Sequence, residues 1–137
     1  MLRDGGALTG LPEAGDRMED GTIYAGISPD NGKPMYTTAE DALRTFTFSG
    51  AKRFVEGFNL GSAHGHHDWR VPTKGELNVL FQNRAAIGGF DISGSDPAGW
   101  YWSSSQGYFD IAWAQRFSDG GQYRFIKDGA SSLRCVR

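Results

Sequence analysis

The apolar residues change their spacing along the chain, from a helical period in the middle to a strand period towards the C-terminus. A face of helical spacing is formed by Phe48, Ala51, Phe54, Val55 and Phe58. Thr47 precedes this face as a candidate cap, and Asn59 and Gly61 follow it as residues that commonly end helices. A first helix is therefore predicted between Thr47 and Gly61.

A second helix is predicted to begin just after Pro72, which holds the preceding residue in an extended conformation. Thr73 and Glu76 have the spacing of a capping box, in which the threonine hydroxyl accepts from a backbone N–H and the glutamate bonds back. Leu77 and Leu80 then continue an apolar helix face. This pattern marks the start of the second helix at Thr73.

Short strands are predicted before and after the two helices. Residues 21–27 and 33–37 flank the turn residues Asn31 and Gly32, which favours a hairpin. Four further strands are predicted over residues 100–103, 111–117, 122–126 and 132–136. Tight turns that contain glycine separate the last three, so neighbouring strands should pair antiparallel.

The alternation of side chains along these strands predicts which residues face the core. Ile111, Trp113, Gln115 and Phe117 alternate with Ala112, Ala114 and Arg116. This period of two predicts that Trp113 and Phe117 point inward. Tyr123 and Phe125 should share one face of their strand, with Arg124 on the other. The run Trp100–Trp102 is likewise expected to belong to the core.

Two helices and a twisted antiparallel sheet predict an α+β domain over residues 21–137. The total of 137 residues also suits one domain. Residues 1–20 carry glycines and acidic residues without an apolar period, so they are interpreted as a flexible N-terminal arm. A contact in a homo-oligomer is one role open to this arm.

The composition restricts the class of protein. The 20 glycines, with 4 Trp, 5 Tyr and 9 Phe, suit tight turns between densely packed elements better than a helical bundle. A net charge of −2 gives no general attraction to nucleic acid. No apolar stretch approaches the ~20 residues of a membrane span, and no signal peptide is predicted. The single cysteine, Cys135, excludes an internal disulfide and is interpreted as a small buried residue of the last strand.

Two groups of polar residues are candidates for a catalytic or metal site. His64, His66, His67 and Asp68 are suitable metal ligands, but their spacing matches no helical histidine pair, and an exposed polar loop is preferred. Ser103–Ser105 lack the turn that surrounds a nucleophilic serine, so their hydroxyls are expected to bond backbone groups at a strand end. No catalytic residue, metal ligand or cofactor is therefore predicted.

The stretch of residues 105–132 is the best candidate for a binding surface. It mixes aromatic residues with arginine, the residue types that anchor protein interfaces. The aromatic and basic residues also fit a base-stacking surface, but Asp110, Asp119 and Asp128 dilute the positive charge, so nucleic-acid binding is not predicted. Tyr108, Phe109, Asp110 and Arg124 are expected at the surface.

Several motifs carry a resemblance to a known family. In sequence order they are Asp68–Thr73 followed by Glu76–Leu77, then Trp100–Ser105, then Ala112–Trp113 with Phe117 and Gly120, and finally Leu133–Arg137. Together they resemble the DUF1566 family, the C-terminal domain type of the Legionella collagen-like adhesin. The resemblance implies a C-type lectin-like fold. The calcium-binding tripeptide of sugar-binding lectins is not present, since Asp96-Pro97-Ala98 departs from it.

The resemblance implies a non-enzymatic module that displays a ligand-binding surface on a phage virion or a bacterial cell. Its partner would be a protein or a glycan on a target surface. Some similar proteins are the variable proteins of diversity-generating retroelements, in which residues 105–132 would be diversified. The candidate ligand-binding residues are Tyr108, Phe109, Asp110, Arg116, Tyr123, Arg124 and Asp128. The alternative is a glycan-binding adhesin domain of fixed specificity.

Overall fold

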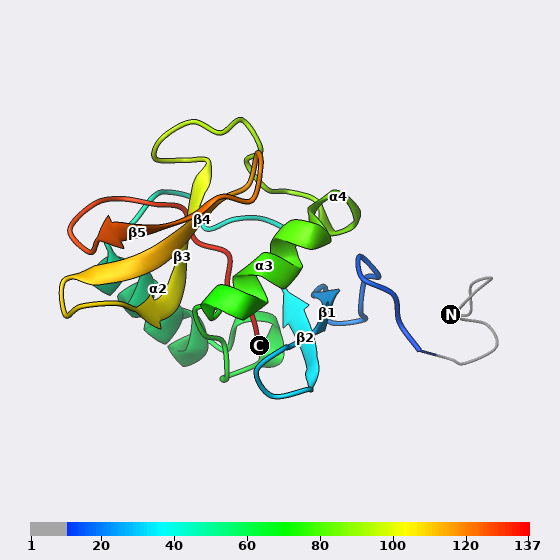
Figure 1. The fold of residues 1–137 in the computed structure, drawn as a ribbon. Coiled ribbons are helices and arrows are strands. Elements are labelled where there is room, and N and C mark those ends of the chain that lie inside the picture. Colours follow the sequence, from blue (N-terminus) through cyan, green and yellow to red (C-terminus); the bar gives the residue numbers. More distant parts are fainter. Residues whose placement is uncertain (1–10) are drawn as a thin grey trace.

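A computed structural model describes residues 11–137 as an α+β fold, as predicted (Figure 1). The N-terminal half contains β1 (Ile23–Ile27), β2 (Pro34–Thr37), α2 (Phe48–Leu60) and the 3-10 turn η1 (Ala63–Gly65). The C-terminal half contains α3 (Lys74–Gln82), α4 (Arg84–Ile87), β3 (Trp100–Gln106), β4 (Ile111–Arg116) and β5 (Gln122–Ile126). The short elements η1 and α4 add to the two helices expected from the sequence.

Both predicted helices are present, with the caps that the sequence indicates. The Thr47 side chain accepts from the Gly50 N–H at the start of α2, and Gly61 follows its end. The capping box of α3 is complete, because Thr73 accepts from the Glu76 N–H and Glu76 accepts from the Thr73 N–H. These caps satisfy backbone groups that a helix end leaves without partners.

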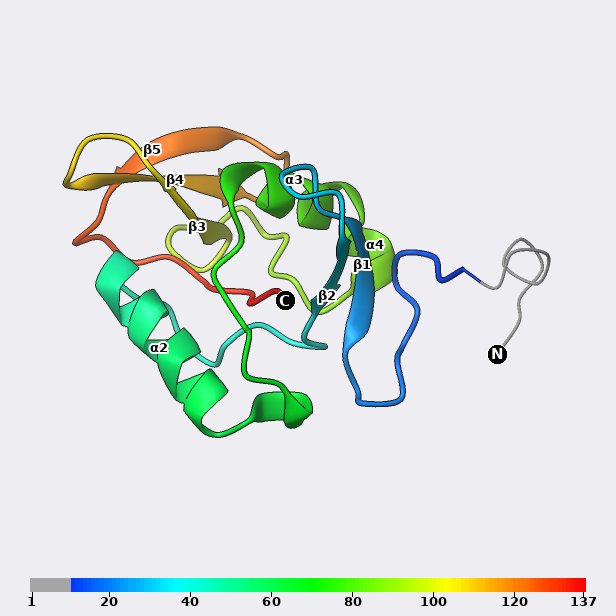
Figure 2. The same cartoon turned by 90° about the horizontal axis from the view of Figure 1, so that it is seen from below.

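The strands form two separate antiparallel sheets rather than one. The β1 and β2 strands make the predicted hairpin, and the second sheet has the order β3-β4-β5. The strand predicted over residues 132–136 is wrong. This segment makes isolated bridges to different partners: Ser132 to Tyr101, and Val136 to both Thr37 and Arg70. It runs between the two sheets (Figure 2) and joins them, so no single neighbour pairs with it along its length.

The buried guanidinium of Arg134 fixes this C-terminal segment. Its Nε donates to Asp41 Oδ1 at 2.9 Å, and its other two nitrogens donate to the carbonyl oxygens of Thr38 and Gly88. The guanidinium also lies 3.8 Å from the centre of the Phe90 ring. One fully buried side chain therefore connects the segment to two loops that are far apart in the sequence.

Residues 11–20 pack against β1 along part of the arm predicted from the sequence. The Gly15 N–H donates to Tyr24 O and the Tyr24 N–H donates to Asp16 O, at 2.8 and 2.9 Å. The bridge between Arg17 and Ile23 continues this pairing. The rest of the predicted arm, residues 1–10, lies outside the described residues.

The core has two parts, on opposite faces of the three-stranded sheet. Between this sheet and α2, a cluster contains Trp100, Trp102, Ala112 and Ala114 of the sheet together with helix residues. The second cluster joins Tyr101 of β3 and Phe117 to α3 and the β1-β2 hairpin. The run Trp100–Trp102 is thus buried as predicted, with alternate residues on the two faces.

The prediction that Trp113 points inward is wrong, because its indole is only partly buried while Ala112 and Ala114 beside it are buried. Ala112 and Ala114 face α2, so Trp113 lies on the opposite face, where it is only partly buried. Phe117, beyond the end of β4, is fully buried as predicted. The side of the sheet that carries Trp113 also carries Tyr101 and packs in part against α3; we call it the outer face.

Candidate binding surface

The tip of the β3-β4 hairpin projects away from the core and carries three predicted ligand residues. Tyr108 and Phe109 are 74% and 90% exposed, and Asp110 is also exposed. Lys127 holds the tip in place: its Nζ donates to Phe109 O and Gln106 Oε1, and its N–H donates to Asp110 O. Aromatic side chains are thus presented to solvent on a loop whose backbone has defined partners.

The outer face continues from this tip along β4 and β5. Trp113 is paired across the strands with Arg124, and these residues therefore share a face. The Lys74 Nζ lies 3.6 Å from the centre of the Trp113 ring, and the Arg124 guanidinium lies 5.9 Å from it. Both distances allow cation–π attraction, so Trp113 lies between a cation of α3 and a cation of β5.

Arg116 and Tyr123, two other predicted ligand residues, lie at the opposite end of the sheet from the tip. They flank the indole of Trp100, with the Tyr123 ring 5.6 Å from it and the Arg116 guanidinium 5.3 Å from it. Arg116 also pairs with Asp119 at 2.5 Å, and this hydrogen-bonded pair lowers the pKa of Asp119 to about 2. Tyr123 nevertheless remains 56% exposed.

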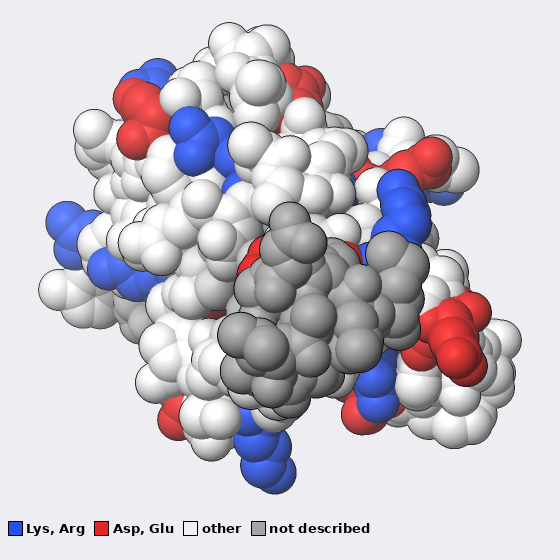
Figure 3. Space-filling view, turned by 90° about the vertical axis from the view of Figure 1, so that its right-hand side faces the viewer, with Lys and Arg blue, Asp and Glu red and all other residues white. Residues whose placement is uncertain are grey.

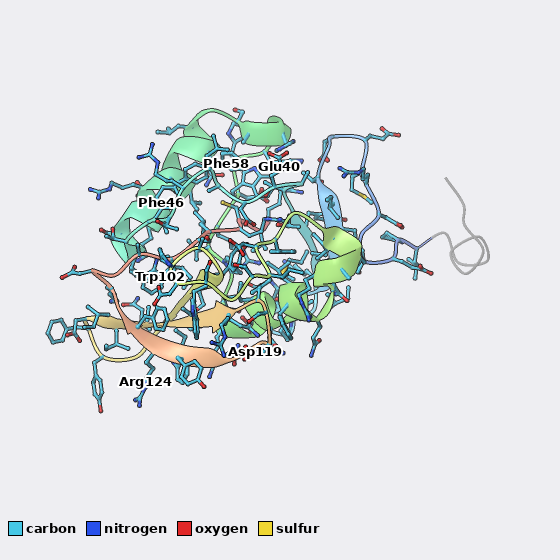
Figure 4. All side chains as sticks on the ribbon, turned by 90° about the horizontal axis from the view of Figure 1, so that it is seen from above. Glu40, Phe46, Phe58, Trp102, Asp119 and Arg124 are labelled. Carbon is cyan, nitrogen blue, oxygen red and sulfur yellow. The ribbon has the colours of Figure 1, made fainter. Side chains whose placement is uncertain are left out.

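The predicted ligand residues therefore form two groups rather than one patch. The tip and the exposed Asp128, in the turn that follows β5, lie at the end of the sheet where β4 begins. Arg124 extends from the outer face towards solvent, and Asp119 marks the other end (Figure 4). Sequence reasoning missed Lys74 and Trp113 at the centre of this surface. The sequence signal that could have placed Trp113 on this surface is the pair of alanines beside it. Ala112 and Ala114 are small enough to pack against the indoles of β3, which leaves Trp113 on the other face.

Charge on another face of the molecule is mixed. Lys and Arg side chains alternate with Asp and Glu side chains over the face shown in Figure 3, without a broad region of one sign. A nucleic-acid surface normally has a concentrated basic footprint. The view therefore gives no support for nucleic-acid binding on that face.

The serine and histidine groups that were candidates for a catalytic or metal site make structural contacts instead. Ser103 Oγ donates to Trp113 O, and Ser105 Oγ accepts from the Lys74 N–H, as expected of hydroxyls at a strand end. His66 Nε2 lies 2.6 Å from Asp20 Oδ2, and this contact lowers the pKa of Asp20. Among residues 11–137, no three His, Cys, Asp or Glu side chains lie close enough to hold a metal. Burial raises the pKa of the Cys135 thiol to about 12.

A groove that the sequence did not predict lies between α2 and the loop of residues 38–46. Its volume is about 510 Å³, and Phe46, Phe54 and Phe58 form an aromatic wall. Glu40 and Arg44 contribute charges to its lining. Figure 4 shows Phe46 and Phe58 on the side of the sheet opposite Arg124, so this groove is separate from the outer face.

Most of the chain matches the model of a known protein family. The profile of the Lcl C-terminal domain family matches residues 29–137. The chain belongs to this family. The match agrees with the resemblance that the sequence motifs carry, and relates this Lcl C-terminal domain to surface adhesins. No curated protein sequence matches the chain. Within residues 11–137, no helix has both the length and the apolar character needed to cross a membrane.

Proposed function

We propose that this Lcl C-terminal domain is a non-enzymatic ligand-binding display module of a phage virion or a bacterial cell surface. Its ligand surface lies within residues 105–132, and its partner is a protein or a glycan on a target. The observation that carries the proposal is the exposure of large apolar side chains there. Tyr108 and Phe109 at the hairpin tip, and Ile126 at the nearby end of β5, are between 60% and 90% exposed, whereas Tyr123, at the other end of β5, is 56% exposed. Exposed apolar groups that cluster on one region are typical of interaction sites.

Within residues 105–132, buried residues are needed for the fold, whereas exposed residues can be substituted. Ala112, Ala114 and Phe117 are fully buried, and substitutions there would disturb the core. The exposed positions can change with little loss of stability, because surface substitutions usually alter it by less than about 0.5 kcal/mol. We therefore propose that a diversity-generating retroelement varies the exposed positions while the buried frame is kept.

The DNA beside the coding sequence tests the diversification. We expect a reverse transcriptase gene and a near-copy of the segment that encodes residues 105–132. The two copies should differ only where the near-copy has adenine. If both features are absent, the proposal of diversification is wrong, and the ligand surface has to be tested by binding alone.

The second candidate function is a glycan-binding adhesin domain of fixed specificity, which the relation to surface adhesins favours. A glycan array would then show one reproducible class of ligand. Binding should disappear when Tyr108→Ala and Arg124→Ala are combined, whereas Leu60→Ala, an exposed change at the end of α2, should leave it unchanged. An array without reproducible binding would contradict this candidate.

A further inference from the structure

The β5 strand has an open edge that no other described segment covers. It is the last strand in the order β3-β4-β5, whereas the opposite edge of the sheet is bridged at Tyr101 to Ser132. Within residues 11–137, the backbone bonds outside the strand ladders reach β5 only at Ile126 O, which accepts from Gly129 N–H in the following turn. Unpaired edges of this kind are ready to bind another extended chain.

The backbone groups that face outward along this edge can be assigned from the ladder. The Arg116 N–H donates to Gly121 O, and the Lys127 N–H donates to Asp110 O, so odd-numbered residues of β5 face β4. Gln122, Arg124 and Ile126 therefore direct their backbone N–H and C=O groups outward, where Ile126 O already accepts from the Gly129 N–H. Pairing of β4 with β5 shows no register shift, while both other strand pairs do. The edge thus lacks the bulge that commonly disfavours strand addition.

The side chains beside this edge favour an acidic partner. Lys74 and Arg124 flank Trp113 on the outer face, and neither forms an ion pair with another residue in the described part of the chain. Ile126 is 60% exposed on the same face. An extended chain added to β5 would place alternate side chains next to Arg124 and Ile126.

We propose that the outer edge of β5 binds an extended acidic peptide segment of a target protein by strand addition. This inference rests on the proposed ligand surface and deepens it. Backbone hydrogen bonds would supply affinity that does not depend on side chains, and pockets or charges beside the edge would supply specificity. Acidic side chains of the partner would meet Arg124 and Lys74. A surface of this kind keeps a common binding mode while its exposed side chains differ.

Synthetic peptides test the inference on the chain itself. The probes are an alternating valine–glutamate peptide of about seven residues, the matching valine–lysine peptide, and a valine–glutamate peptide N-methylated at alternate residues. Binding is followed by chemical shifts of backbone amides during titration. We expect the valine–glutamate peptide to shift the amides of Gln122, Arg124 and Ile126, and to bind at least about tenfold more tightly than either other peptide.

Variants of Arg124 separate the backbone contribution from the charge. Arg124→Gln removes the charge alone, whereas Arg124→Pro removes the charge together with one outward N–H and leaves the bonds to β4, because proline is tolerated at a strand edge. Arg124→Pro should therefore bind the valine–glutamate peptide about tenfold more weakly than Arg124→Gln. Arg124→Glu should reverse the preference towards the valine–lysine peptide. Arg53→Glu makes the same charge change at an exposed site on α2 and should leave both affinities unchanged.

The outcomes distinguish failure of the inference from failure of the proposed function. Chemical-shift changes at Tyr108 and Phe109 without changes along β5 would refute strand addition but would remain consistent with the proposed ligand surface. Shifts confined to residues outside 105–132 would refute both. If the N-methylated peptide binds as well as its parent, or no peptide binds, strand addition is wrong. A dimer that forms through β5 without peptide would identify a second copy as the occupant and would also overturn the inference.

Discussion

Trp102 of β3 lies directly opposite Ala114 of β4, and both face α2 in the core. The indole is fully buried, its Nε1 donates to Phe46 O at 2.7 Å, and the Phe48 ring meets it edge-on. Such a large group leaves room only for a small side chain across the ladder. This pair therefore determines which face of β4 packs towards α2, and it places Trp113 on the outer face.

Replacement of Trp102 and replacement of Trp113 should have different effects, because Trp102 is a core residue and Trp113 is a surface residue. Trp102→Ala should lower the free energy of unfolding by about 3 to 5 kcal/mol, because it leaves a cavity and removes one of the two hydrogen bonds that Phe46 O accepts. Trp113→Ala should cost about 1 kcal/mol and mainly weaken ligand binding, since its indole is partly exposed. Chemical denaturation and binding measurements on both variants check this. A Trp102→Ala protein that stays fully stable but loses its ligand would contradict the assignment.

Removal of the Arg134 guanidinium should be more harmful than removal of a similar group at the surface. Arg134→Met leaves Asp41 and two backbone carbonyls without their buried donor, at a cost of about 3 to 5 kcal/mol. Arg134→Lys should not restore stability, because one ammonium cannot reach all three acceptors. Arg137→Met is the matched control, since its pair with Asp68 is exposed and should contribute less than about 1 kcal/mol. Equal effects of Arg134→Met and Arg137→Met in thermal unfolding would refute this prediction.

Glu76 should make stability depend on acidic pH. Burial alone would raise its pKa, but hydrogen bonds from Arg70, Ser28 and the Thr73 N–H outweigh burial and lower the pKa from 4.5 to about 2. The folded state therefore binds its proton more weakly than the unfolded state. This contribution, on the order of 3 kcal/mol, is present above the unfolded pKa and is lost as the pH falls through the folded pKa.

Unfolding in denaturant between pH 6 and pH 2 measures that contribution. Glu76→Gln should be less stable at pH 6 and should lose less stability on acidification than the parent. Glu56→Gln, an exposed change on α2, is the control and should keep the parent's pH dependence. Parallel pH profiles for the parent and Glu76→Gln would show that the prediction is wrong.

Lys127 should order the ligand-bearing tip without contributing much to global stability. Lys127→Met keeps the length of the side chain but removes the donor to Phe109 O and Gln106 Oε1. Faster amide exchange is then expected over residues 107–110, together with weaker ligand binding. The control is Lys52→Met, because Lys52 also lies over the Phe48 ring but makes no bond to the tip. Unchanged exchange at the tip in Lys127→Met would contradict this role.

The sequence alone identified the elements whose signals are local. The caps of α2 and α3, the β1-β2 hairpin and the order of the later strands depend on residues a few positions apart, and propensity acts at that range. Surface exposure of Tyr108 and Phe109 was also predicted, because the tip lies in a turn between strands. The resemblance carried by the motifs gave the family.

Tertiary structure decided what depends on partners distant in the sequence. The alternation of β4 fits either face equally well, and only the indole of Trp102 across the ladder selects Ala114 for the core. The segment of residues 132–136 reads as a strand, but its hydrogen-bonding partners come from separate parts of the chain. Nor does spacing show that Lys74 covers Trp113, because α3 and β4 meet only through packing. The period of two in the sequence shows that alternate residues of β4 share a face, but only the volumes of the neighbouring side chains decide which of the two faces packs towards α2.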